Sequence, residues 1–155
     1  MSPALPKGML SLEELKEKII AGEIETILAV FPDLYGRLVG KRITADFFLD
    51  QTAHSGMHAC DYLLTVDMEM DVIAGYDFAN WDKGYGDFHC APDFSTLRHA
   101  TWLDRTALVL CDLQTDETHR PIPVAPRTLL KNQIARLQDL GYTAMGGSEL
   151  EYFLF

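Results

Sequence analysis

The pattern of hydrophobic and polar positions predicts a helix near the start of the chain, followed by a β-hairpin. Ser11, with Glu14 three residues later, forms a capping-box pattern ahead of LEELKEKIIAG, where leucine and isoleucine recur at helical spacing. Gly22 is expected to end this helix. The segments TILAVF and RLVGKRI then have the composition of strands, and PDLYG between them supplies a turn.

The middle of the chain is expected to add strands around one long loop. ADFFLDQ suggests a short helix, and CDYLLTVDMEMDV has the composition of another strand. The stretch from Ala74 to Gly86 is rich in glycine, aspartate and aromatic residues, which is typical of a loop. Two further strands are expected, one ending at Pro92 and one from Thr106 to Leu113. Together these elements predict an α+β domain.

A change of composition predicts a domain boundary near residue 118. Residues 114–124 are mostly polar and contain two prolines, as a linker would. Pro126 then stands in the first turn of a helix, PRTLLKNQIARLQDLG, with Gly141 at its end. A turn and a strand, GYTAMGGSELEYFLF, follow. We therefore expect residues 1–118 to form one domain and residues 119–155 to begin a second, incomplete one.

Charge and composition exclude several classes of partner. The chain has 13 basic and 23 acidic residues, and its net charge of -10 repels nucleic acid phosphates and anionic membrane surfaces. No apolar run approaches the roughly 20 residues that cross a bilayer, and the first residues lack a secretory pattern. We expect no nucleic acid or membrane partner, and a cytoplasmic location. Cys60, Cys90 and Cys111 form no C-x-x-C pair, so reduced thiols are expected.

Two carboxylates near the end of the sequence are candidate metal ligands. In an extended strand Glu149 and Glu151 would share one face, with Cα atoms about 6.5 Å apart. Two carboxylates held close together favour a cation between them, and Mg²⁺ or Mn²⁺ prefers oxygen ligands. The alternative is an ordinary exposed strand face, because this spacing of glutamates is common.

A second candidate metal site lies in HSGMHAC. His54, His58 and Cys60 could supply three zinc ligands if the backbone folded suitably. The spacing differs from that of zinc fingers, and no second ligand pair follows, so scattered histidines are the favoured interpretation. His89 and Cys90 are adjacent on a predicted strand and would point to opposite faces, which makes them a poor chelating pair.

Several longer motifs follow one another in a fixed order. They are PDLYGRLVGKRI, YGDFHCAPDFSTL, WLDRTALVLCDL, APRTLL and GGSELEYFLF. This set, from about Leu12 to Phe155, resembles the N-terminal part of glutamine synthetase family enzymes. The resemblance implies a β-grasp-like N-terminal domain followed by the first helix and strand of a truncated catalytic domain. It also implies that Glu149 ligates a metal ion on the nucleotide side, and Glu151 one on the glutamate side.

The resemblance further implies an activity. Members of the family join ammonia or an amine to the γ-carboxylate of glutamate through a γ-glutamyl phosphate, with ATP as co-substrate and Mg²⁺ or Mn²⁺ as cofactor. The full-length protein would be a homo-oligomeric ring in which the loop from Ala74 to Asp87 reaches a neighbouring subunit's active site. These residues alone would be inactive. A non-catalytic β-grasp interaction module is the alternative function.

The loop departs from the pattern of ammonia-using members. It lacks an F-D-G-S-S stretch and reads IAGYDFANWDKGYGD, in which Trp81 and Asp87 match family positions and Asp77 could replace the ammonium-binding aspartate. This difference favours relatives that use polyamines, ethanolamine or alkylamines. Ordinary loop packing of Tyr76, Phe78 and Trp81 is the alternative.

Overall fold

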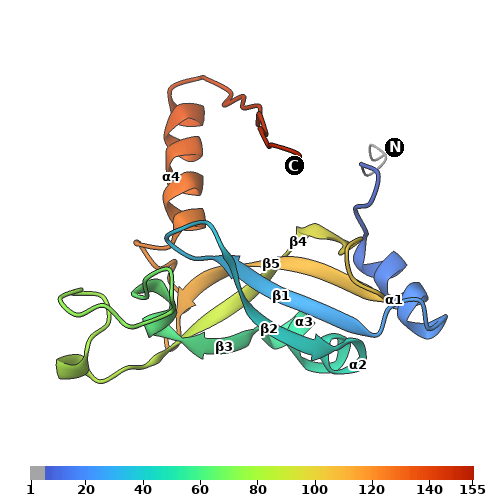
Figure 1. Cartoon of the computed structure of the whole chain (residues 1–155), viewed down its shortest axis with the longest axis horizontal. Helices are drawn as coiled ribbons and strands as arrows, with labels where there is room; N and C mark the ends of the chain where they lie inside the picture. Colours follow the sequence, from blue (N-terminus) through green and yellow to red (C-terminus); the bar gives the residue numbers. More distant parts are fainter. Residues whose placement is uncertain (1–5) are drawn as a thin grey trace.

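A five-stranded mixed sheet forms the centre of the computed structural model, which describes residues 6–155 (Figure 1). The strands lie in the order β2-β1-β5-β4-β3. Their bounds are β1 Thr26–Pro32, β2 Leu38–Thr44, β3 Met57–Cys60, β4 Asp87–His99 and β5 Thr106–Thr115. The central strands β1 and β5 are parallel, and β2, β4 and β3 extend the sheet in antiparallel pairs. This arrangement confirms the expected α+β, β-grasp-like class.

The capping box predicted for the first helix is present. Helix α1, Leu12–Ile20, begins after Ser11, whose hydroxyl accepts a hydrogen bond from the Glu14 backbone N–H at 3.1 Å. The Ser11 backbone N–H in turn donates to Glu14 Oε2 at 2.7 Å. Gly22, just past the helix end, has a φ of +71°, a conformation that glycine adopts without steric cost.

The β1–β2 hairpin forms as predicted, and its turn is held by one buried carboxylate. Asp33 is 1% exposed and accepts hydrogen bonds from the backbone N–H groups of Tyr35 and Arg37, both at 2.9 Å. The Arg37 side chain adds a salt bridge of 2.6 Å to Asp33 and donates to the carbonyls of Asp67 and Met68. Arg37 therefore connects this turn to Asp67 and Met68, which lie 30 and 31 positions later in the sequence.

The short helix predicted at ADFFLDQ is longer than expected. Helix α2, Ala45–Phe47, continues through a π-helical turn, Phe48–Thr52, into α3, Ala53–Ser55. Phe48 is fully buried and meets the ring of Phe94 edge to face, with centroids 6.5 Å apart. The crossover from β2 to β3 therefore covers the apolar face of the sheet.

The core lies on one side of the sheet, against α1 and the α2–α3 crossover. Alternation along β1 sends Ile27, Ala29 and Phe31 into this core, whereas Val30 joins a smaller cluster with Leu108 on the other face. Burial on both sides explains why β1 reads as a nearly continuous apolar run.

The prediction of a strand over residues 60 to 72 is wrong. Strand β3 ends at Cys60, and a 3₁₀ helix, Asp61–Leu64, follows. The Asp67 carboxylate then accepts hydrogen bonds from the backbone N–H groups of Glu69 and Asp71, at 3.0 and 2.9 Å. Such local side-chain bonds compete with a strand ladder and produce a turn.

The strand expected to end at Pro92 continues to His99. Its pairing with β3 stops at Cys90, so Pro92 lies where that side of β4 has no neighbouring strand among the described residues. The register against β5 shifts just beyond it, between Asp93 and Arg98. Proline is tolerated at such edges and irregularities because the N–H that it lacks is not needed there.

The last helix forms as predicted, but the strand after it does not. Helix α4, Pro126–Asp139, has its proline in the first turn and Gly141, with a φ of +81°, past its end. It projects away from the sheet (Figure 1). Residues 142–155 form neither helix nor strand, so Glu149 and Glu151 do not lie on a strand face. A strand needs a neighbour for its N–H and C=O groups, and no described strand pairs with this segment.

A network of charged groups fastens the start of α4 to the sheet. Arg127 Nε lies 2.9 Å from Asp112 Oδ1, and Arg127 Nη2 lies 2.5 Å from Asp93 Oδ2. Lys131 adds a contact of 2.5 Å to Asp112. The Arg127 and Asp93 side chains are only 18% and 20% exposed, so solvent screens this pair less than a surface salt bridge.

The charge network also sets the ionisation of Asp93. Partial burial acts to raise the pKa of Asp93, but hydrogen bonds from Ser95 and the charges of Lys131 and Arg127 outweigh it, so the pKa is lowered. Because folding lowers this pKa, the stabilisation is complete above the ordinary aspartate pKa. It is lost as the pH falls through the lowered value.

We expect Gly56→Ala to destabilise the fold far more than Gly36→Ala. Both glycines have a positive φ, +67° and +81°, but an added Cβ at Gly56 would lie 2.7 Å from the Cys90 carbonyl oxygen, whereas Gly36 has open space. Strain and overlap together should lower the free energy of unfolding by about 2–5 kcal/mol at Gly56, against about 1–2 kcal/mol at Gly36. Urea denaturation measures both, and equal losses would contradict the packing around Gly56.

Candidate functional site

The predicted loop between Ala74 and Gly86 is present and is held by its own hydrogen bonds. Its one regular element is a 3₁₀ helix, Trp81–Lys83. The Asn80 side chain caps this helix by accepting from the Lys83 backbone N–H at 3.0 Å, and it donates to the Tyr76 carbonyl at 2.8 Å. The Lys83 ammonium group donates to the Asp77 carbonyl. These bonds give a glycine-rich loop a defined shape.

The loop borders a solvent-open cavity of about 230 Å³ lined by aromatic and acidic residues. The residues that line it include Tyr76, Trp81 and Tyr85 together with Asp77 and Asp82. Trp81 is 82% exposed, and its ring meets that of Tyr85 edge to face with centroids 5.1 Å apart. Aromatic faces beside carboxylates are suited to an organic ammonium group, because the rings attract the cation and accept its alkyl part.

The structure brings together some of the candidate substrate residues and separates others. Asp77 and Trp81 line the same cavity, whereas Asp87 does not line it and begins β4 opposite Cys60. Phe78 packs partly against the main core, so the loop-packing alternative holds for that residue. Tyr85 and Asp82 belong to the cavity but were not among the predicted residues, since no spacing pattern distinguishes them from other loop residues.

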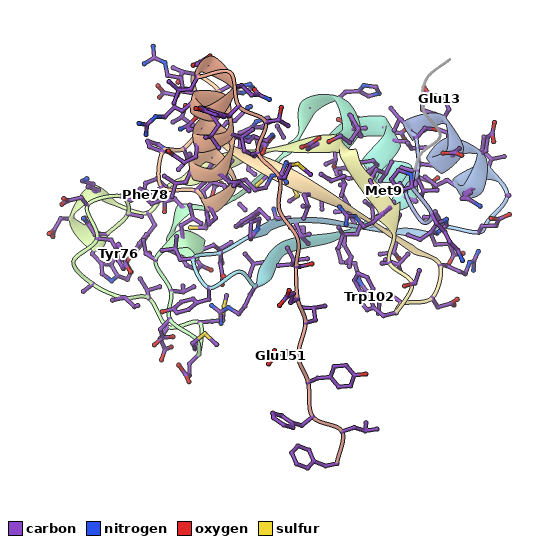
Figure 2. All side chains as sticks on the ribbon, turned by 90° about the horizontal axis from the view of Figure 1, so that it is seen from above. Met9, Glu13, Tyr76, Phe78, Trp102 and Glu151 are labelled. Atoms are coloured by element: carbon purple, nitrogen blue, oxygen red, sulfur yellow. The ribbon has the colours of Figure 1, made fainter. Side chains whose placement is uncertain are left out.

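The candidate metal ligands lie far from this loop. Figure 2 shows Glu151 on the segment that projects from the molecule, well separated from Tyr76 and Phe78. Glu149 and Glu151 are both exposed, and within residues 6–155 neither takes part in a salt bridge. The part of the chain that the structure describes contains no group of three or more metal-ligating side chains. Two free carboxylates fit Mg²⁺ or Mn²⁺ chemically but supply only part of a shell of about six oxygens.

The candidate zinc ligands are not gathered into a site. His54 is exposed on α3. His58 Nε2 lies 2.8 Å from Asp116 Oδ1, so the imidazole of His58 contacts a carboxylate. His89 is buried and has a structural role, with Nε2 2.8 Å from the Ser55 carbonyl. Its ring stacks on that of His119 with centroids 4.3 Å apart, a contact that the sequence pattern did not indicate.

The three thiols are free, as expected. Cys90 and Cys111 are fully buried in the core, and burial raises the pKa of Cys90 to about 12 and also raises that of Cys111. Cys60 is partly buried at the end of β3. Buried, protonated thiols are poor nucleophiles, so the two core cysteines contribute packing alone.

Among the described residues, no helix has both the length and the apolar character that a membrane crossing requires.

The chain is similar to known amide-forming enzymes. It is 44% identical over 94% of its length to a γ-glutamylethanolamide synthetase, GlnA4, of Streptomyces coelicolor, and covers 31% of that protein. It is 34% identical over 99% of its length to a glutamate–isopropylamine ligase of a Pseudomonas species, and covers 33% of it. A solved structure of GmaS with ADP matches 81% of the chain at a TM-score of 0.60 and 25% identity, over 26% of that protein. No family model matches.

These similarities agree with the fold. In sequence and fold, the chain matches the N-terminal region of glutamine synthetase family proteins. It spans about a third of the length of the curated relatives that it matches.

We expect the 155-residue chain to bind Mn²⁺ weakly, with a dissociation constant of about 1 mM or higher, because Glu149 and Glu151 provide too few oxygens. Titration calorimetry measures this. A micromolar site that Glu149→Ala abolishes and His54→Ala leaves intact would contradict it. Tight Zn²⁺ binding lost in both His54→Ala and Cys60→Ala would instead support the zinc site.

Proposed function

We propose that the whole protein is an ATP-dependent ligase that joins an organic amine to the γ-carboxylate of glutamate. The observation that carries this proposal is the cavity of aromatic and acidic side chains in a chain that is 44% identical to a γ-glutamylethanolamide synthetase. In the reaction, the γ-carboxylate takes the terminal phosphoryl group of ATP. The amine nitrogen then attacks the acyl carbon, inorganic phosphate leaves and the amine loses a proton.

The ligase would need a divalent metal ion, and this chain would supply part of its site. Glu149 would face the nucleotide side and Glu151 the glutamate side. When bound, Mg²⁺ or Mn²⁺ would neutralise charge on the phosphates and on the glutamate carboxylate. Residues 1–118 would form the N-terminal domain and residues 119–155 the beginning of the catalytic domain. The remaining ligands would come from other parts of the protein, so these residues alone would be inactive.

The loop cavity supports an amine larger than ammonia as the acceptor. An ammonium ion has no apolar surface, so only charge and hydrogen bonds can select it. Each buried CH₂ of a larger amine contributes about 0.8 kcal/mol, and Tyr76 and Trp81, which line the cavity, would supply such contact. Asp77 or Asp82 would orient the ammonium group. The two curated relatives described above are named for ethanolamide and isopropylamine products and substrates.

We expect the full-length protein to have a higher kcat/KM for at least one organic amine than for ammonium. Trp81→Ala should lower the ratio of kcat/KM for that amine to kcat/KM for ammonium about 10-fold. This change is equivalent to the loss of one cation–π contact of about 1–2 kcal/mol. Phosphate release with glutamate, ATP, saturating Mg²⁺ and a panel of amines measures it. Trp102→Ala is the matched control, because Trp102 is exposed elsewhere on the molecule (Figure 2). Ammonium as the best substrate would contradict the proposal.

We further propose that the protein forms a homo-oligomeric ring in which this loop completes the site of a neighbouring subunit. The separation of the loop from Glu151 supports it, because the two halves of the candidate site lie apart within one chain (Figure 2). A second subunit could bring a loop to the segment that carries Glu149 and Glu151.

We expect two impaired full-length variants to regain activity when mixed. Trp81→Ala or Asp87→Ala damages the loop half, and Glu151→Ala damages the metal half, so some mixed interfaces combine two intact halves. Phosphate release after subunit exchange measures the recovery. Exchange shown by mass spectrometry without recovered activity would mean that each site lies within one subunit.

A further inference from the structure

The two ends of the loop segment meet at Asp61 and Gly86, just beyond the last paired residues of β3 and β4. The ladder ends at Cys60 opposite Asp87. Past it, the Asp61 backbone N–H donates to the Gly86 carbonyl at 2.9 Å. The Gly86 backbone N–H donates to Asp61 Oδ2 at 3.2 Å. The Asp61 side chain therefore closes the loop where the sheet no longer holds it.

A chain of aromatic contacts runs from this closure to the cavity. The ring of Tyr62, next to Asp61, meets Tyr85 edge to face with centroids 5.9 Å apart. Tyr85, next to Gly86, meets Trp81 with centroids 5.1 Å apart. Tyr85 and Trp81 both line the cavity. Tyr62 and Tyr85 thus connect the closure at Asp61 and Gly86 to Trp81.

Asp61 occupies a setting that is unfavourable for a carboxylate. Its Oδ1 atom is buried and has no hydrogen-bond partner among the described residues. Burial raises the pKa of Asp61; the Gly86 N–H opposes that shift, and the nearby charge of Asp87 adds to it. The Asp61 carboxylate therefore keeps its hydrogen bond to Gly86 although its own burial costs free energy. This hydrogen bond uses only one of the two side-chain oxygens.

We propose that Asp61 is a positioning residue for amine recognition, acting through Gly86 and Tyr85 on Trp81. It does not line the cavity, and its effect is to keep the aromatic wall in one orientation. This role rests on the proposed amine ligase function. Asp61 lies outside the loop that the sequence motifs identified, so it would be an additional residue that determines amine specificity.

The first test uses the 155-residue chain and needs no activity. Asp61→Ala should speed amide hydrogen exchange at Gly86 about 10-fold, the equivalent of one lost hydrogen bond. In a Trp102→Phe background, it should also increase the fast component of Trp81 fluorescence anisotropy decay. Asp61→Asn keeps an oxygen for the Gly86 N–H and should behave like the unchanged chain. Equal exchange at Gly86 in all three proteins would overturn the proposal.

A global loss of stability must be separated from this local effect. The Val109 amide, on the central strand β5, is the reference, and its exchange should not change in Asp61→Ala. Faster exchange at Val109 and Gly86 by the same factor would show general unfolding. The proposal would then be wrong.

The second test uses the full-length protein. Asp61→Ala should raise the KM for the preferred organic amine about 10-fold, with the KM for glutamate and ATP unchanged, and Asp61→Asn should restore it. Equal increases in all three KM values would overturn the positioning role. Failure of the proposed function gives a different result, in which the unchanged protein releases no amine-dependent phosphate, and Gly86 exchange alone then decides whether Asp61 holds the loop.

Discussion

The parallel pairing of β1 with β5 is the constraint from which the rest of the fold follows. Parallel neighbours cannot be joined by a tight turn, so the chain between them has to leave the sheet centre and return. Strand β2 pairs on the outer side of β1 before the crossover, and β3 and β4 are added on the outer side of β5. The segment between β3 and β4 therefore lies at the sheet margin, where a long loop can border a cavity without disturbing the core.

Elements with local signals could be predicted from the sequence. The capping box at Ser11, the turn at Asp33 and Pro126 in a first helical turn each specify structure within a few residues, and each formed as expected. The prediction of a strand after Asp61 was wrong because the Asp67 side chain accepts hydrogen bonds from nearby backbone N–H groups. The hydrophobic pattern of the sequence does not indicate these bonds. The last strand failed for the opposite reason, since its sequence suits a sheet but no described strand pairs with it.

The candidate site was predictable in its residue types but not in its geometry. The resemblance to the family pointed to Asp77 and Trp81, and both line one cavity in the structure. Tyr85 and Asp61 could not, because their roles arise from contacts between the two ends of a long segment. Likewise, the burial of His89 against Ser55 depends on the pairing of β3 with β4. Sequence motifs identify chemistry, whereas such contacts require the fold.

The same topology imposes an order on how the molecule is made. The pairs β1–β2 and β4–β5 join residues close in sequence and close their loops at low entropic cost, so each can form early. The β1–β5 pair joins Thr26 to Thr106, and contacts of such high sequence separation form late and slowly. During synthesis on the ribosome, the first hairpin must wait with its inner edge unpaired until β5 has emerged, which is the stage at which the nascent chain is most exposed to non-native strand pairing.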